Sequence, residues 1–115
     1  MKYVFHVDHV QDWATALSNM KNTVGLGGKN MVVPLENEIV AVINGTAVYA
    51  VQGISDWTQA MQQLAEAGVR FEICSNALTG HQIPCETLPQ WLHVVPSAIP
   101  AIAEYQKRGY VYIKP

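Results

Sequence analysis

Apolar residues occur along the chain in short runs that are separated by glycine and by polar turn residues. Five runs, at residues 2–7, 38–43, 69–73, 92–95 and 110–113, are rich in β-branched and aromatic side chains, which favour strands. The first two runs are apolar at almost every position, as expected for strands covered on both faces. The pattern therefore predicts a sheet of about five buried strands.

Between these runs, apolar residues recur at spacings of three and four, which is the periodicity of an amphipathic helix. Such segments cover about residues 11–24, 56–67 and 98–107, and the second follows Ser55 or Asp56 as a capping residue. Strands that alternate with helices at this spacing predict a mainly parallel sheet with helices packed on its faces, because right-handed crossovers are nearly universal. The predicted fold class is a layered α/β domain.

Two segments fit more than one structure. The sequence Gly-Leu-Gly-Gly-Lys at residues 25–29 resembles a phosphate-binding loop. It follows a helix instead of joining a strand to a helix, so we interpret it as a helix end and a loop. Residues 46–52 form a short apolar stretch, which fits an edge strand, a helical turn or a contact between subunits.

Cys74 stands at the end of the third predicted strand. Ser75 and Asn76, which follow it, are capping residue types, and residues 77–78 can begin a helical turn. The thiol would then lie beside unpaired backbone N–H groups, whose partial positive charge favours the thiolate, the form of cysteine that attacks or carries sulfur. The alternative is that Cys74 packs as a small apolar residue, since free cysteines are often buried.

The turns that follow parallel strands should meet at one edge of the sheet, where proteins of this class bind ligands. These turns and the loop after Cys74 supply the candidate binding residues around the thiol: Asp8, His9, Asn44, Ser75, Asn76 and His81. Either His9 or His81 could act as a base or as a cationic neighbour of the thiol. Asn76 could bind the sulfur or simply cap a helix.

The histidines and carboxylates near this edge are also candidate metal ligands. His6 and Asp8 share one face of an extended strand, but that spacing is a loose constraint, and we predict no metal site. Ten residues lie between Cys74 and Cys85, a spacing that matches no zinc motif. Cys85 could resolve an oxidised Cys74 into a disulfide or could be an incidental loop residue.

The composition and net charge of the chain limit which assemblies and partners are expected for it. The chain has 115 residues, enough for one domain, and 50% of them are hydrophobic while only 14% are charged, against about 25% charged in an average soluble domain. A surface short of charge favours burial against further copies of the chain, so we expect a homo-oligomer. The net charge of −2 argues against nucleic acid. Without a signal peptide or a membrane-spanning run, the expected location is the cytoplasm, with both thiols free.

Four stretches of the sequence carry a resemblance to the DsrE/DsrF-like family. They are residues 2–8, 16–22, 68–78 and 94–115, of which the third contains Cys74 within Gly-Val-Arg-Phe-Glu-Ile-Cys-Ser-Asn-Ala-Leu. The resemblance implies a flavodoxin-like, three-layer α/β/α sandwich and a trimeric or hexameric assembly. It also implies kinship with sulfur-relay proteins that carry sulfur as a cysteine persulfide without a cofactor, and it places Cys74 at the position of the sulfur-accepting cysteine.

The chain departs from the better-understood sulfur carriers of this family soon after the cysteine. Those carriers have a basic, arginine-bearing stretch there, whereas residues 75–81 read Ser-Asn-Ala-Leu-Thr-Gly-His. Two hypotheses therefore remain. The first is a sulfur carrier or sulfurtransferase that uses Cys74 and has sulfur-donor and sulfur-acceptor proteins as partners. The second is a homo-oligomer that binds a small molecule or protein, in which Cys74 only lines a pocket or packs.

Overall fold

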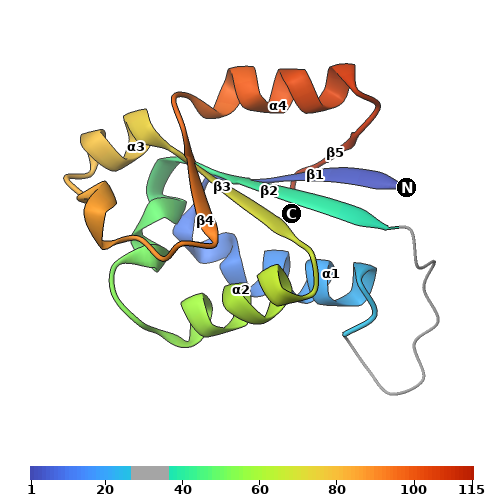
Figure 1. Cartoon of the computed structure of the whole chain (residues 1–115), viewed down its shortest axis with the longest axis horizontal. Coiled ribbons are helices and arrows are strands. Elements are labelled where there is room, and N and C mark those ends of the chain that lie inside the picture. The colour runs from blue at the N-terminus through green and yellow to red at the C-terminus, as the bar shows by residue number, and fades with distance from the viewer. Residues whose placement is uncertain (27–36) are drawn as a thin grey trace.

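The computed structural model describes residues 1–26 and 37–115 and shows a sheet between two layers of helices (Figure 1). All strand pairs in the sheet are parallel, and the strand order is β4-β3-β2-β1-β5. The strands are β1 (Lys2–Val7), β2 (Glu38–Ile43), β3 (Arg70–Cys74), β4 (Leu92–Val95) and β5 (Val111–Ile113). The predicted fold class and the five predicted strands are confirmed.

The helices are α1 (Trp13–Thr23), α2 (Asp56–Glu66), α3 (Ser75–Gly80) and α4 (Ala98–Lys107), with short 3₁₀ helices η1 (Val10–Asp12), η2 (Gly45–Val51) and η3 (Cys85–Thr87). Three of the helices, α1, α2 and α4, occupy the segments in which periodicity predicts them. Ser55 caps α2, because its hydroxyl accepts the Thr58 N–H while the Thr58 side chain accepts the Ser55 N–H. None of the described helices is long and apolar enough to cross a membrane.

The strand order explains which face each helix covers. The chain moves outward from β1 through β2 to β3 and β4, and then returns to place β5 on the other side of β1. A right-handed crossover in the outward direction puts α1 and α2 on one face, and the return crossover puts α4 on the opposite face (Figure 1). The direction of the connections therefore changes between β3, which leads outward to β4, and β4, which leads back to β5; ligand sites in such sheets form where the direction changes.

The two faces have unequal cores. Most of the buried apolar side chains lie between the sheet and the α1–α2 layer. The opposite face has only α4, and its apolar cluster is small: Val4, Val40, Val42, Cys74, Ala98, Ile102 and Tyr105. Two polar side chains of the sheet, His6 and Glu72, are also buried, with 7% and 4% of their surface exposed. The face covered by α4 alone therefore buries polar side chains as well as apolar ones.

The segment at residues 46–52 is a helical turn, since all but its last residue belong to η2. Its apolar side chains Ala47, Val48, Ala50 and Val51 are buried in the chain's own core, and only Tyr49 among its large apolar residues is exposed. The buried side chains are not available for the subunit contact that we considered for this stretch. The glycine-rich run leaves α1 as expected, but its residues 27–29 lie outside the described part of the chain.

The turn from β2 into η2 depends on Gly45. Its φ is +56°, and a Cβ atom at this position would lie 2.3 Å from the backbone oxygen of Asp8. No side chain can be accommodated at that distance unless the backbone of one turn moves. Gly45 therefore allows the turns after β1 and β2 to approach each other at the carboxyl edge of the sheet.

We expect Gly45→Ala to lower the free energy of unfolding by about 2 kcal/mol or more, because it combines left-handed strain with a backbone clash. Gly53→Ala is the matched control, since Gly53 has a φ of +80° with no atom within 4 Å of the added Cβ, and it should cost only about 1 kcal/mol. Urea denaturation of both variants measures the difference. Equal losses would show that the approach to Asp8 does not matter.

Candidate functional site

Three residues form a row at the carboxyl edge of the sheet. Val7, Ile43 and Ile73 are paired across β1, β2 and β3, so the residues that follow them, Asp8, Asn44 and Cys74, come next in the same register. Val7, Ile43 and Ile73 all point into the α1–α2 core. Because side chains alternate along a strand, the three following residues face the α4 side. The predicted meeting of these turns at one edge is confirmed.

Cys74 ends β3 and is itself the N-terminal cap of α3. Its Sγ accepts the backbone N–H of Ala77 at 3.4 Å. The expectation that the thiol lies beside a helix start is confirmed, but the expectation that Ser75 or Asn76 provides the cap is wrong. The helix begins two residues earlier than the sequence suggests, so Ser75 and Asn76 are its first two residues, half-buried and exposed respectively.

The side chains that pack around Cys74 between the sheet and α4 are mostly apolar. The residue is only 5% exposed and belongs to the cluster under α4 that contains Val42 and Ala98. This burial is what a packing cysteine would show. Cys85 is exposed at the start of η3, and neither cysteine is in a disulfide.

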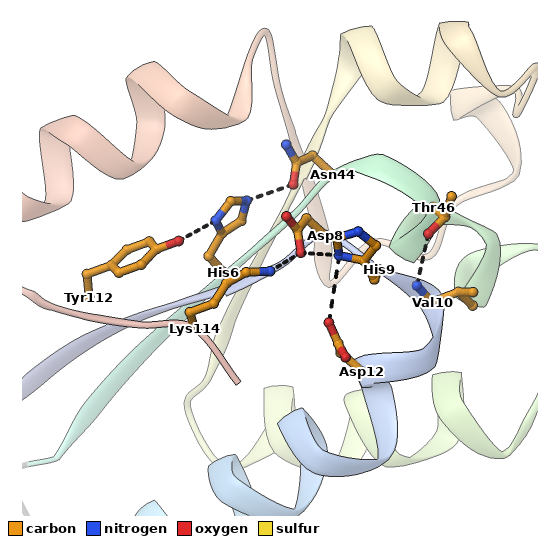
Figure 2. Close-up of polar contacts among 9 residues, drawn as sticks. All are labelled: His6, Asp8, His9, Val10, Asp12, Asn44, Thr46, Tyr112 and Lys114. Carbon is orange, nitrogen blue, oxygen red and sulfur yellow. Dashed lines mark hydrogen bonds and ion pairs between the residues drawn. The ribbon is translucent and has the colours of Figure 1, made fainter.

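His6 connects the row to the C-terminal strand (Figure 2). Its Nδ1 lies 2.7 Å from the Tyr112 hydroxyl, and its Nε2 lies 2.8 Å from Oδ1 of Asn44. The imidazole is thus held at both nitrogens. From the sequence, His6 is only a weakly supported metal ligand. Nothing in the sequence indicates that Tyr112 is its partner, because the two residues are 106 positions apart and only the strand order brings them together.

Asp8 and His9 belong to a second polar group at this edge (Figure 2). Nδ1 of His9 lies 2.8 Å from Oδ1 of Asp8 and 3.8 Å from Asp12, and the Lys114 ammonium forms an ion pair with Asp8. Burial acts to raise the pKa of Asp8, but the hydrogen bonds from Lys114 and His9 outweigh it and hold that pKa below its usual value. The negative charge of Asp8 is therefore already balanced.

The polar group around Asp8 contains side chains of the types that bind metal ions. Ligand atoms of Asp8, His9 and Asp12 all lie within 4.8 Å of one another. Lys114 already supplies a positive charge to Asp8, and the His9 side chain is more than half exposed. The group fits an ion-pair cluster that joins the C-terminus to the first turn, and the chemistry of its donors does not require a metal ion.

The two histidines proposed as neighbours of the thiol have other partners. His9 is hydrogen-bonded to Asp8. His81 follows α3, and its Nδ1 lies 2.8 Å from the Tyr49 hydroxyl, with the two rings edge to face at 4.9 Å. Among the described residues, the hydrogen bond to the Cys74 sulfur comes from the backbone N–H of Ala77 and not from a histidine. A role of either histidine as base for Cys74 stays a prediction.

A buried carboxylate lies two residues before Cys74 on the same strand face. Glu72 Oε2 accepts the Tyr105 hydroxyl at 2.5 Å and Nε of Arg70 at 2.8 Å. Burial and the hydrogen bond with Glu72 raise the pKa of Tyr105 to about 12, and the hydrogen bond with Glu72 raises the pKa of Arg70. Sequence reasoning missed this group because Glu72 lies inside an apolar run.

The Tyr105 hydroxyl should make stability fall at high pH. In the unfolded chain a tyrosine ionises near pH 10, whereas folded Tyr105 keeps its proton to about pH 12. Its contribution is therefore complete below pH 10 and is lost as the pH rises from 10 to about 12. We expect the free energy of unfolding, measured in urea over this range, to fall less steeply for Tyr105→Phe than for the unaltered protein. Equal slopes would contradict the assignment.

A model of the DsrE/DsrF-like family matches residues 10–115. The chain belongs to this family. The match confirms the resemblance seen in the sequence, and no curated protein matches the chain.

Among solved structures, the DsrE-like fold is similar to that of a protein of unknown function, MTH1491 from Methanobacterium thermoautotrophicum. The two are 26% identical, with a TM-score of 0.82 over 99% of this chain and 98% of the other. The similarity therefore extends over the whole domain, including the carboxyl edge that holds Cys74.

Proposed function

We propose that this DsrE/DsrF-like protein carries sulfane sulfur as a persulfide on Cys74, as a sulfur carrier or sulfurtransferase. The observation that carries the proposal is the hydrogen bond from the Ala77 N–H at the start of α3 to the Cys74 sulfur. An N–H group at a helix start stabilises negative charge, and both the thiolate and its persulfide are anions. Membership of a family related to sulfur-relay proteins supports the same chemistry.

The transfer needs no cofactor and no net oxidant. The Cys74 thiolate attacks the outer sulfur of a donor persulfide, a bond forms between the two sulfurs, and the donor's S–S bond breaks. The donor leaves as a thiolate with the electron pair of that bond. In the reverse sense, an acceptor thiolate attacks the outer sulfur on Cys74 and releases the Cys74 thiolate. The natural donor and acceptor would be proteins in the cytoplasm, where thiols stay reduced.

A second candidate function has an observation of its own. Cys74 is 5% exposed and packs with apolar side chains under α4, as a structural cysteine does. On that basis the protein is a homo-oligomer that binds a small molecule or a protein. Alkylation separates the two: a carrier thiol reacts in the folded protein near neutral pH, and a packing thiol reacts only after denaturation.

We expect treatment with a small hydropersulfide, such as glutathione persulfide, to add one sulfur atom at Cys74 that a reducing agent removes. Cys74→Ser should abolish this adduct and keep the fold, because a hydroxyl can accept the same Ala77 N–H. Intact-mass spectrometry followed by peptide mapping measures the adduct. Cys85→Ser is the matched control and should leave the adduct in place.

Two results would contradict the carrier proposal. One is that the sulfur attaches to Cys85, the exposed thiol, while Cys74 stays unmodified. The other is that Cys74→Ser unfolds the protein, as judged by circular dichroism, because the thiol is then needed for packing. Either result favours the binding function.

We further propose that the protein is a homo-oligomer, most simply a trimer or a pair of trimers. The low content of charged residues, 14%, supports this assembly, as do exposed apolar side chains such as Ile54 and Ile99, with 90% and 62% of their surface exposed. Light scattering should give three or six times the chain mass of 12.7 kDa. A stable monomer at micromolar concentration would remove the proposal.

A further inference from the structure

The Asn44 amide lies beside Cys74 in the row at the carboxyl edge. β2 and β3 are paired through Ile43 and Ile73, so Asn44 and Cys74 occupy neighbouring strands, about 4.8 Å apart, and both face the α4 side. Asn44 is half-buried and its backbone is still extended, which keeps the strand alternation through this residue. Its amide is therefore the polar side chain from β2 that borders the space next to the thiol.

The hydrogen bonds of His6 fix which end of the Asn44 amide is used. Oδ1 of Asn44 only accepts, so Nε2 of His6 carries the proton and donates to it at 2.8 Å. In a neutral imidazole the other nitrogen then accepts, and the Tyr112 hydroxyl donates to Nδ1 at 2.7 Å. The result is a directed chain of hydrogen bonds, Tyr112 to His6 to Asn44, in which each bond polarises the next.

This chain leaves the Asn44 Nδ2 group as a donor without a side-chain partner among the described residues. Figure 2 shows the Asn44 amide nitrogen pointing away from His6. His6 is 93% buried, as only 7% of its surface is exposed, so the imidazole cannot turn freely and the amide has one favoured orientation. A half-buried donor held in place by two further side chains is the arrangement expected of a group that binds a ligand.

We propose that Nδ2 of Asn44 donates a hydrogen bond to the outer sulfur of a persulfide on Cys74, and that His6 and Tyr112 are positioning residues for that amide. The inference rests on the proposed carrier function. A persulfide extends the Cys74 side chain by one S–S bond, about 2 Å, and the outer sulfur carries the negative charge. Ala77 N–H then serves the inner sulfur and Asn44 the outer one, so each sulfur has its own donor.

Asn44→Asp tests the role of the amide with little change of shape. Aspartate keeps an oxygen that accepts the His6 Nε2–H, but it replaces the donor by a negatively charged oxygen that faces the persulfide. With glutathione persulfide as the donor and glutathione as the competing thiol, we expect the equilibrium amount of persulfide on Cys74 to fall roughly tenfold or more. Asn22→Asp makes the same change on the exposed surface of α1 and should have no effect.

Tyr112→Phe tests the positioning role. This change removes the hydroxyl that holds His6 and leaves Asn44 itself unchanged. The equilibrium amount of persulfide on Cys74 should therefore fall, but by less than in Asn44→Asp. The rate at which iodoacetamide alkylates the free thiol should stay the same. A merely structural role would change both readouts together.

The outcomes separate the two proposals. If the unaltered protein takes up no sulfur at Cys74, the carrier function fails. If it takes up sulfur and folded Asn44→Asp holds an equal amount, the carrier function stands and the role of Asn44 is wrong. If Asn44→Asp loses the persulfide, and Tyr112→Phe, which adds no charge, also holds less persulfide at an unchanged alkylation rate and melting temperature, the amide binds the outer sulfur.

Discussion

The common parallel register of β1, β2 and β3 is the constraint on which the site depends. Because Val7, Ile43 and Ile73 are paired, the residues that follow them, Asp8, Asn44 and Cys74, lie at the same level and face the α4 side. A slip of one residue in any strand would turn its last side chain into the α1–α2 core. The apolar residues of that core therefore fix the positions of Asp8, Asn44 and Cys74, although none of the three belongs to it.

The unequal covering of the sheet determines where polar chemistry is found. With only α4 on the second face, His6 and Glu72 are buried with polar partners instead of being replaced by apolar residues. The last elements of the chain supply those partners: Tyr105 from α4 donates to Glu72, and the Tyr112 hydroxyl from β5 is hydrogen-bonded to His6. A buried polar group without a partner costs more than most single contacts contribute, so the C-terminal segment is needed to keep this face intact.

Much of the fold follows from local patterns, and the pairings within the site do not. The strands and the helices α1, α2 and α4 were predicted to within a few residues, because each has a clear apolar period and a capping or glycine signal. The location of Cys74 followed from the same reasoning. The partners of His6, Glu72 and His81 could not be predicted, because they depend on β5 lying beside β1, on α4 covering the second face and on how α3 meets η2. Short segments such as η2 have no decisive period, and their burial is settled only by the packed structure.

The burial of Cys74 is compatible with sulfur carriage for a physical reason. A persulfide is lost to any thiol that reaches its outer sulfur, so a carrier must restrict access as well as stabilise the anion. Apolar packing under α4 excludes solvent from one side of the sulfur, while the Ala77 N–H supplies a donor on the other. An exposed thiol such as Cys85 has neither property and would exchange its sulfur with small thiols. In this protein, therefore, low exposure counts against Cys74 as a carrier only if the folded thiol is also unreactive toward a small donor.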